Sequence, residues 1–208
     1  MLLVLSMSVI NAQMSGTDLA KKVAAAYGVD NFKKAKMMTF TFNAKRDTAV
    51  NSRSWNWNIA ENIVTMTTTK ETVTYKRDTI QSAAMKSVDQ KFINDQYWLI
   101  FPYHLVWDNG FTLTTKQKII SPIAKKEMTV LTVQYNNKDG YTPGDAYDLY
   151  LDTNFMISEW TYRKGGVEKP TLSTTWQNMI EEKGLKIATN HQTVDGKFSI
   201  YFNGVTVK

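Results

Sequence analysis

The sequence predicts an α+β protein that is mostly β: a strongly curved antiparallel sheet, or unclosed β-barrel, packed around a few helices. One helical pattern lies near the N-terminus, and from Met38 onward apolar residues alternate with polar ones at a period of two. Hydrophobic residues make up 43% of the chain and aromatic residues 12%. This content is enough to build a large core and excludes a disordered protein.

The N-terminal helix is predicted to begin with Thr17 as its cap and to present the apolar residues of Leu19–Ala26 at helical spacing. Gly28 is expected to end it, because glycine readily adopts the left-handed conformation of a helix C-terminus. No other segment of the chain shows so clear a helical period.

Eleven segments are predicted as strands of one continuous, mostly antiparallel sheet, because they are rich in β-branched and aromatic residues and are separated by turn residues. Asp152–Asn154 and residues 138–145 are predicted turns, and Asn203-Gly204 is a hairpin signal. The predicted strands are 38–44, 52–59, 63–69, 71–77, 111–117, 129–135, 146–151, 156–163, 172–177, 185–189 and 198–207.

The middle of the chain, Val88–Trp107, is dense in large apolar groups and does not alternate cleanly. Because Pro102 lacks a backbone N–H and interrupts a helix, we expect a short helix from about Val88 to Asn94. An irregular segment packed onto the sheet is expected to follow it.

The first residues indicate export. Met1–Ile10 is apolar and uncharged, and Ala12 offers a small residue for cleavage, so residues 1–12 are predicted as a signal peptide and 13–208 as one domain. No basic residue precedes the apolar run, and a buried first strand or helix is the alternative. The chain has no cysteine, so neither a disulfide nor a lipid anchor on cysteine is expected. We expect a monomer, periplasmic or secreted, without a transmembrane segment.

The formal net charge of +6 raises the question of nucleic-acid binding. No nucleic-acid-binding motif accompanies the basic residues, which form short interrupted clusters. We therefore expect no nucleic-acid partner and interpret the clusters as solvated surface, with attraction to anionic lipid as the alternative. The clusters are Lys33, Lys34 and Lys36, and Lys116, Lys118, Lys125 and Lys126.

Catalytic and metal-binding patterns are missing from the sequence. The two histidines, His104 and His191, lack metal-ligand neighbours, and His104 is expected to be packed and hydrogen-bonded. Asp148 and Asp152 would lie about 13 Å apart on one strand, which is too far for a glycosidase pair. We interpret them as turn-capping and surface residues. The sequence thus predicts no enzyme, no catalytic residue, no metal and no cofactor.

Aromatic side chains are concentrated on the predicted strands. Such rings bury large areas and often line sites for apolar ligands, although they also fill ordinary cores. A curved sheet that does not close around its own side chains would leave a cavity between them. The candidate ligand-binding residues are Phe40, Phe42, Trp55, Trp57, Trp98, Phe101, Trp160 and Trp176.

Nearly the whole chain after residue 12 resembles an envelope protein family with the fold of the LolA-type periplasmic lipoprotein carriers. The resemblance implies an unclosed β-barrel around helices and a hydrophobic cavity that holds acyl chains in the carriers. There an arginine near the cavity helps to hold a helical lid shut, and Arg46 and Arg53 are the candidates in this sequence. The motifs are Thr39-Phe-Thr-Phe42, Arg53-Ser-Trp-Asn-Trp57, the segment Phe92–Leu99 with Pro102, the segment Gly140–Tyr147, and Tyr150-Leu-Asp152.

Three hypotheses about function follow. The first is a non-enzymatic envelope protein that binds an apolar ligand, such as lipid or lipoprotein acyl chains, in a cavity between the curved sheet and the helices. The second is an envelope protein–protein interaction module with a filled core, which would act through the turn at 139–145 and the basic clusters. The third is a hydrolase whose carboxylates are brought together only by the fold.

Overall fold

The computed structural model describes residues 14–79, 82–136 and 143–208, and within these it has three α-helices and twelve strands. The helices are α1 (Gly16–Ala26), α2 (Val29–Phe32) and α3 (Ala83–Trp107), and two 3₁₀ turns are η1 (Arg77–Thr79) and η2 (Lys164–Gly166). The strands are β1 (Met37–Arg46), β2 (Ala49–Asn58), β3 (Ile63–Thr67), β4 (Thr72–Lys76), β5 (Phe111–Ile120), β6 (Glu127–Tyr135), β7 (Ala146–Leu151), β8 (Ile157–Arg163), β9 (Leu172–Thr175), β10 (Gln177–Glu182), β11 (Leu185–Gln192) and β12 (Phe198–Val207).

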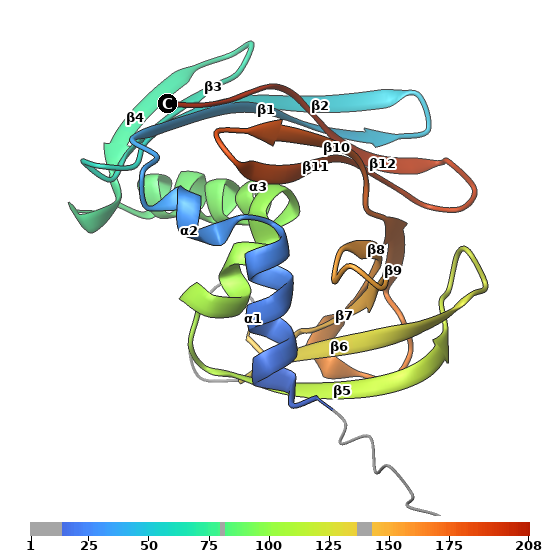
Figure 1. Ribbon diagram of the computed structural model, residues 1–208. Coiled ribbons are helices and arrows are strands. Elements are labelled where there is room, and N and C mark those ends of the chain that lie inside the picture. Colours follow the sequence, from blue (N-terminus) through green and yellow to red (C-terminus); the bar gives the residue numbers. More distant parts are fainter. Residues whose placement is uncertain (1–13, 80–81, 137–142) are drawn as a thin grey trace, which may run out of the picture.

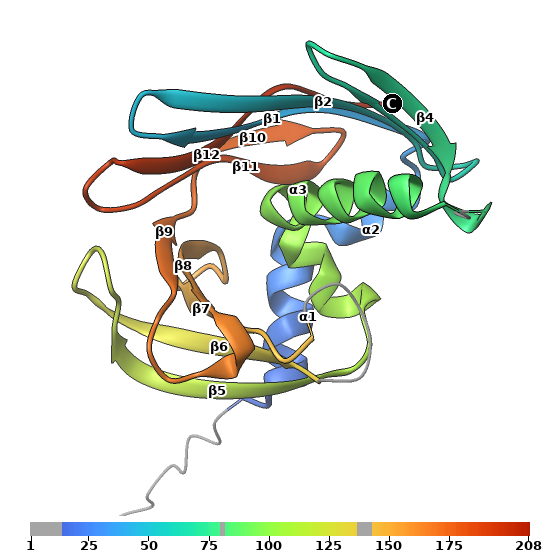
Figure 2. The same ribbon diagram turned by 180° about the vertical axis from the view of Figure 1, so that it is seen from behind.

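Two antiparallel sheets enclose the helices. One has the strand order β10-β11-β12-β1-β2-β3-β4 and the other the order β5-β6-β7-β8-β9. Figure 1 shows the seven-stranded sheet above and the five-stranded sheet below, with α1 and α3 between them. From behind, α3 runs along the underside of the upper sheet and then bends towards the lower one (Figure 2). This arrangement confirms the predicted fold class, a curved and unclosed antiparallel structure packed around helices.

The expected continuous sheet is divided at Trp176. The predicted strand 172–177 is split there, so that Leu172–Thr175 belongs to one sheet and Gln177–Glu182 to the other. The Trp176 backbone N–H still donates to the Ser158 carbonyl at 2.9 Å, while its indole is only 3% exposed. The chain changes sheets at this residue because burying the large ring between the two sheets is favourable.

The N-terminal helix begins two residues earlier than predicted. Ser15, not Thr17, is the cap, and its hydroxyl accepts a hydrogen bond from the Asp18 N–H at 3.1 Å. Gly28 has a φ of +82°, as the sequence predicts, and a second constraint acts on it: a Cβ there would lie 2.1 Å from the Gly184 carbonyl oxygen. Only glycine fits this close approach.

The prediction for the middle of the chain was wrong: Ala83–Trp107 is a single helix, α3, with a kink at Ile100. Pro102 bends the helix instead of ending it, because the segment is held on both sides by packing. Phe92, Leu99 and Phe101 are all at most 1% exposed. The helix shows no clear amphipathic period, because the polar residues Asp89, Asp95 and Gln96 are buried and Leu99–Leu105 is buried all round.

The hairpin expected at Asn203-Gly204 was also wrong, because both residues lie inside β12. Gly204 has a φ of +61°, and the pairing of β12 with β1 shifts register between Thr39 and Thr41. The glycine therefore marks a β-bulge. By contrast, the turn at Asp152 is confirmed, since its carboxylate accepts the N–H groups of Asn154 and Met156 at 2.8 and 2.9 Å. The predicted turn 138–145 lies mostly outside the described residues.

Two buried ion pairs fix α3 to the seven-stranded sheet. Arg53 of β2 binds both carboxylate oxygens of Asp95 at 2.9 and 2.7 Å, and the Trp55 indole donates to the same carboxylate at 2.8 Å. Arg77 binds Asp89 at 2.7 Å. Both carboxylates are at most 1% exposed, so the two arginines compensate charges that would otherwise be costly to bury.

Candidate ligand-binding cavity

A cavity of about 390 Å³ lies between α3 and the five-stranded sheet. The α3 residues that line it follow the spacing i, i+3, i+4, i+7, i+8, which places them on one face of the helix. The opposite wall comes from β7, β8 and the residue before β7. The lining residues are Gln90, Ile93, Asn94, Tyr97 and Trp98 of α3, and Asp145, Tyr147, Trp160 and Tyr162 of the sheet side.

Aromatic rings make up most of the wall. Trp98 of the helix lies 4.6 Å from Trp160 of β8, measured between ring centroids. Tyr147 lies 5.3 Å from Trp160 and stacks on its cross-strand partner Tyr162 at 5.5 Å. Gln90 and Asn94 are exposed and form a polar rim. The cavity is thus apolar inside with a few polar groups at its edge, as ligand sites commonly are.

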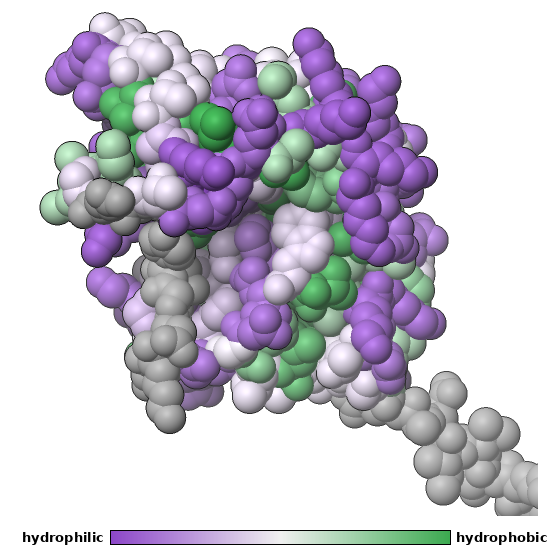
Figure 3. All heavy atoms as spheres, turned by 90° about the vertical axis from the view of Figure 1, so that its left-hand side faces the viewer, coloured by the Kyte–Doolittle hydropathy of each residue, from purple (hydrophilic) through white to green (hydrophobic). Residues whose placement is uncertain are grey.

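The molecular surface is hollowed on the face shown in Figure 3, where hydrophilic and hydrophobic residues lie side by side near the centre of the view. The cavity lining likewise combines the aromatic side chains of tyrosine and tryptophan with amide and carboxylate groups.

Asp145 is the charged member of the lining set. Its backbone carbonyl accepts the Tyr135 N–H at 2.9 Å, which extends the pairing of β6 with β7 by one residue. Successive residues of an extended chain point to opposite faces, so Asp145 and Tyr147 share a face. The carboxylate accepts the Tyr162 hydroxyl at 2.9 Å and the Gly165 N–H at 2.7 Å.

A hydrogen-bonded cluster holds Tyr97 in place. The hydroxyls of Tyr97 and Tyr135 both donate to Oδ2 of Asp108, and His104 Nδ1 lies 2.8 Å from Oδ1. Burial disfavours ionisation of Asp108, but the hydrogen bonds from His104 and the tyrosines outweigh it and lower its pKa. Burial and the neighbouring Asp108 charge raise the pKa of Tyr97, which therefore remains a donor.

His104 belongs to this cluster, and the sequence predicts it to be packed and hydrogen-bonded. The residue is 6% exposed and its side chain is hydrogen-bonded, as predicted. Among the residues that the structure describes, no group of three or more metal-ligating side chains comes together. In the same part of the chain no helix is both long and apolar enough to cross a membrane.

The eight aromatic residues singled out from the sequence fall into two groups. Trp98 and Trp160 line the cavity. Phe101 lies directly behind them, 4.9 Å from Trp160 and 5.2 Å from Tyr147, and Trp176 lies 5.0 Å from Trp160. The remaining four, Phe40, Phe42, Trp55 and Trp57, are at most 9% exposed on the inner face of the seven-stranded sheet.

Phe92 explains why this second group lies away from the cavity. It projects from α3 towards the upper sheet, within 5.3 Å of Trp55 and 5.4 Å of Trp57, and is fully buried. The space between α3 and the seven-stranded sheet is therefore filled by side chains at this point. The opposite side of α3 borders the cavity.

Sequence reasoning did not select Tyr97, Tyr147, Tyr162 and Asp145 as site residues. A signal existed for the tyrosines of the sheet, because Tyr162 shares a strand face with Trp160. Tyr97 and its neighbours at positions 90, 93, 94 and 98 could be recognised only once the segment was known to be helical. Asp145 directly precedes β7, and its place at the cavity could be recognised only from the tertiary structure.

Of the two arginines considered as lid contacts, Arg53 contacts a helix through Asp95. Its guanidinium also lies 4.9 Å from the centre of the Phe42 ring. Arg46 is exposed near the β1–β2 turn, 5.6 Å from the Phe198 ring. Arg53 thus links the sheet to α3, and Arg46 does not contact a helix through an ion pair or hydrogen bond among the described residues.

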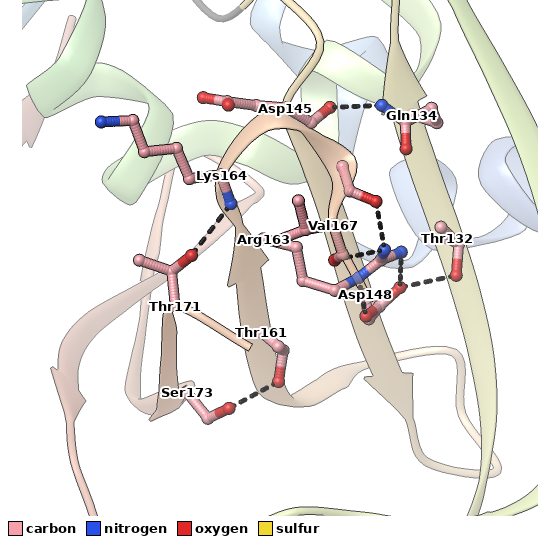
Figure 4. A network of polar contacts seen from close by, with 11 residues as sticks. Thr132, Gln134, Asp145, Asp148, Thr161, Arg163, Lys164, Val167, Thr171 and Ser173 are labelled. Atoms are coloured by element: carbon pink, nitrogen blue, oxygen red, sulfur yellow. Dashed lines mark hydrogen bonds and ion pairs between the residues drawn. The ribbon is translucent and has the colours of Figure 1, made fainter. Parts of the chain in front are cut away.

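The carboxylate of Asp148 is on the other face of the five-stranded sheet, where it has a structural role. Arg163 binds it at 2.8 and 3.0 Å, and the Thr132 hydroxyl donates to it at 2.7 Å (Figure 4). Arg163 also donates to the carbonyls of Gly166 and Val167, which fastens the η2 turn. The turn-capping interpretation is thus confirmed for Asp152, whereas Asp148 is not a solvated surface residue, because its side chain is only 14% exposed and is paired with Arg163.

Comparison with solved structures identifies the architecture. A LolA superfamily protein from Nitrosomonas europaea superposes with a TM-score of 0.54 at 8% identity, covering 94% of each chain. A domain from Vibrio parahaemolyticus, named for outer membrane lipoprotein sorting, superposes with a TM-score of 0.50 at 12% identity, covering 93% of this chain and 92% of that one. The fold is LolA-like. This confirms the resemblance inferred from the sequence motifs.

A DUF1329 family protein from Desulfovibrio piger ATCC 29098 also matches, with 7% identity, 94% coverage of each chain and a TM-score of 0.48. No protein-family model matches the sequence. No curated protein matches it either. At such low identity, the LolA-like architecture is what the similarity establishes.

Proposed function

We propose that this LolA-like protein is a non-enzymatic carrier of the bacterial envelope that binds the apolar part of a lipid-like molecule between α3 and the five-stranded sheet. The observation that carries the proposal is the aromatic cavity of about 390 Å³. Its volume lies at the small end of the roughly 300–1,000 Å³ typical of ligand sites. One acyl chain or a small amphiphile suits this volume better than a ligand with several chains.

Two further observations support a carrier. The name of the Vibrio parahaemolyticus domain refers to lipoprotein sorting, which makes acyl chains the favoured class of ligand. The predicted signal peptide at residues 1–12 would deliver the chain to the envelope.

The chemistry of the cavity also favours binding over catalysis. Its described lining contains one carboxylate, Asp145, and no serine, lysine or histidine that could complete a nucleophile–base pair. Ligand affinity would come from apolar burial, at about 25 cal/mol per Å² before the costs of association. A ligand that buries roughly 200 Å² would gain about 5 kcal/mol by this measure.

Native mass spectrometry of the protein from its own envelope tests the proposal first, because retained lipid appears as added mass. The delipidated protein is then titrated with a fluorescent alkyl probe. Asn94→Trp should block the exposed rim of the cavity and weaken binding at least fivefold. Lys86→Trp adds the same ring to an exposed position of α3 outside the cavity lining and should bind like the wild type.

Equal binding by these two variants would place the ligand elsewhere. Absence of any saturable probe binding, together with absence of bound lipid in the mass spectrum, would overturn the carrier function itself.

A further inference from the structure

We infer that the cavity selects amphiphiles with a positively charged ammonium head and disfavours those with an anionic head. This inference rests on the proposed function and deepens it by naming the head-group chemistry. The structural basis is the juxtaposition of the Asp145 carboxylate with the aromatic side chains of Tyr147, Trp160 and Tyr162 in one cavity wall.

The charge of the cavity is opposite to that of the protein. The chain carries a formal net charge of +6, yet Asp145 is the charged residue among the nine that line the cavity. No lysine, arginine or histidine is among them. A cationic head group would therefore enter a site whose own charge is negative.

Within the described residues, the hydrogen bonds of Asp145 leave its charge uncompensated. The two groups that donate to its carboxylate, the Tyr162 hydroxyl and the Gly165 N–H, are both neutral. Within the described part of the chain, no basic side chain lies within ion-pair distance of it, whereas Asp148 nearby is paired with Arg163. Figure 4 shows the Asp145 carboxylate directed away from the Asp148–Arg163 pair. Lys164 belongs to the same turn as Gly165 but is exposed to solvent.

The aromatic rings supply the second part of such a site. The face of a tyrosine or tryptophan ring attracts a cation, and the attraction is larger when the cation is partly desolvated. Tyr162 touches the carboxylate through its hydroxyl and stacks on Tyr147, which in turn packs against Trp160. The wall thus continues from the charged end towards Trp98 and Ile93, where an alkyl tail would lie.

An anionic head group would be repelled by the negative charge of the cavity. A fatty-acid carboxylate placed beside Asp145 would be repelled, and none of the lining residues carries a compensating positive charge. Selectivity between two ligands depends on the difference in their binding free energies, so both effects add in favour of the ammonium head.

Three single-chain probes of equal length separate head-group selection from simple apolar binding: decyltrimethylammonium, decanol and decanoate. Each probe is titrated into the delipidated protein below its critical micelle concentration. Binding is measured by calorimetry and by the change in tryptophan fluorescence. We expect decyltrimethylammonium to bind at least tenfold more tightly than decanoate, with decanol between them.

Asp145→Asn should reduce the affinity for decyltrimethylammonium about five- to tenfold and leave decanol unchanged, which also shows that the cavity is intact. Asp30→Asn removes the same charge from an exposed helix position and should leave all three affinities unchanged. Decanoate binding as tightly as decyltrimethylammonium, or a preference that survives in Asp145→Asn, would overturn the inference while the carrier function stands. Failure of all three probes, decanol included, would overturn both.

Discussion

Trp98 and Trp160 lie with their ring centroids 4.6 Å apart, one on the central helix and the other on a strand of the five-stranded sheet. This contact lies in the cavity wall and joins α3 to the lower sheet. On its other side, α3 is joined to the upper sheet through Phe92 and the two buried ion pairs. The helix therefore separates a filled layer from one that leaves space for a ligand.

Because the tryptophans of the two layers differ in environment, their removal should have different effects. Trp57→Ala should lower the free energy of unfolding by about 3–5 kcal/mol, the usual cost of removing a large buried ring. Trp98→Ala should cost less stability, since Trp98 is only half-buried, but should weaken alkyl-probe binding several-fold. Urea denaturation and probe titration of both variants measure the two effects. If both variants are fully folded under the titration conditions and lose the same amount of probe affinity, the assignment of Trp57 to the core and Trp98 to the cavity is contradicted.

Arg53 should be more important to stability than its partly exposed side chain suggests. Arg53→Met leaves the carboxylate of Asp95 buried without its counter-ion, and we expect a loss of about 3 kcal/mol in unfolding free energy. In the double variant with Asp95→Asn, part of this loss should be recovered, because no buried charge remains. A double variant no more stable than Arg53→Met would show that the ion pair is not the source of the effect. Chemical denaturation of the three proteins provides the double-mutant comparison.

Acid should destabilise the protein through His191. Burial lowers the pKa of this side chain from 6.5 to about 3 in the folded protein. Between these values the unfolded chain binds more protons, so stability is constant above about pH 6.5 and falls as the pH decreases towards 3. At pH 5 this corresponds to a loss of about 2 kcal/mol relative to pH 7.

The measurement is the unfolding midpoint in urea at several values of pH between 5 and 7. His191→Leu removes the titrating group and should flatten the dependence in this range. If the unfolding midpoint of His191→Leu depends on pH as strongly as that of the wild type, another titrating group is responsible for the acid destabilisation.

The close approach at Gly28 should make it far more sensitive to substitution than other glycines with positive φ. Gly28→Ala should lower the unfolding free energy by 3 kcal/mol or more, on the order of backbone strain plus a steric clash with the Gly184 carbonyl. Gly196→Ala, at a φ of +67° with no atom within 4 Å of the added Cβ, should cost only about 1 kcal/mol. Thermal unfolding of both variants compares them directly, and similar losses would show that φ alone is responsible.

Local patterns were sufficient where the structure is local. Period-two alternation located strands such as β1, in which buried and partly exposed residues alternate. Gly28 was recognised because a helix end requires a left-handed residue. The strand split at Trp176 and the bulge at Gly204 were missed. Both depend on how the chain packs against strands that are distant in sequence.

The sequence by itself determined the type of protein: a β-rich chain with a large aromatic content and no recognisable catalytic motif. Only the tertiary structure decided which aromatic residues surround a space and which fill one. The physical reason lies in α3, whose residues face two different sheets. Phe92 fills the upper layer, while the face that carries Tyr97 and Trp98 meets the lower sheet around a cavity with Asp145 at its edge. That division follows from the path of a kinked helix between two sheets, which no local pattern encodes.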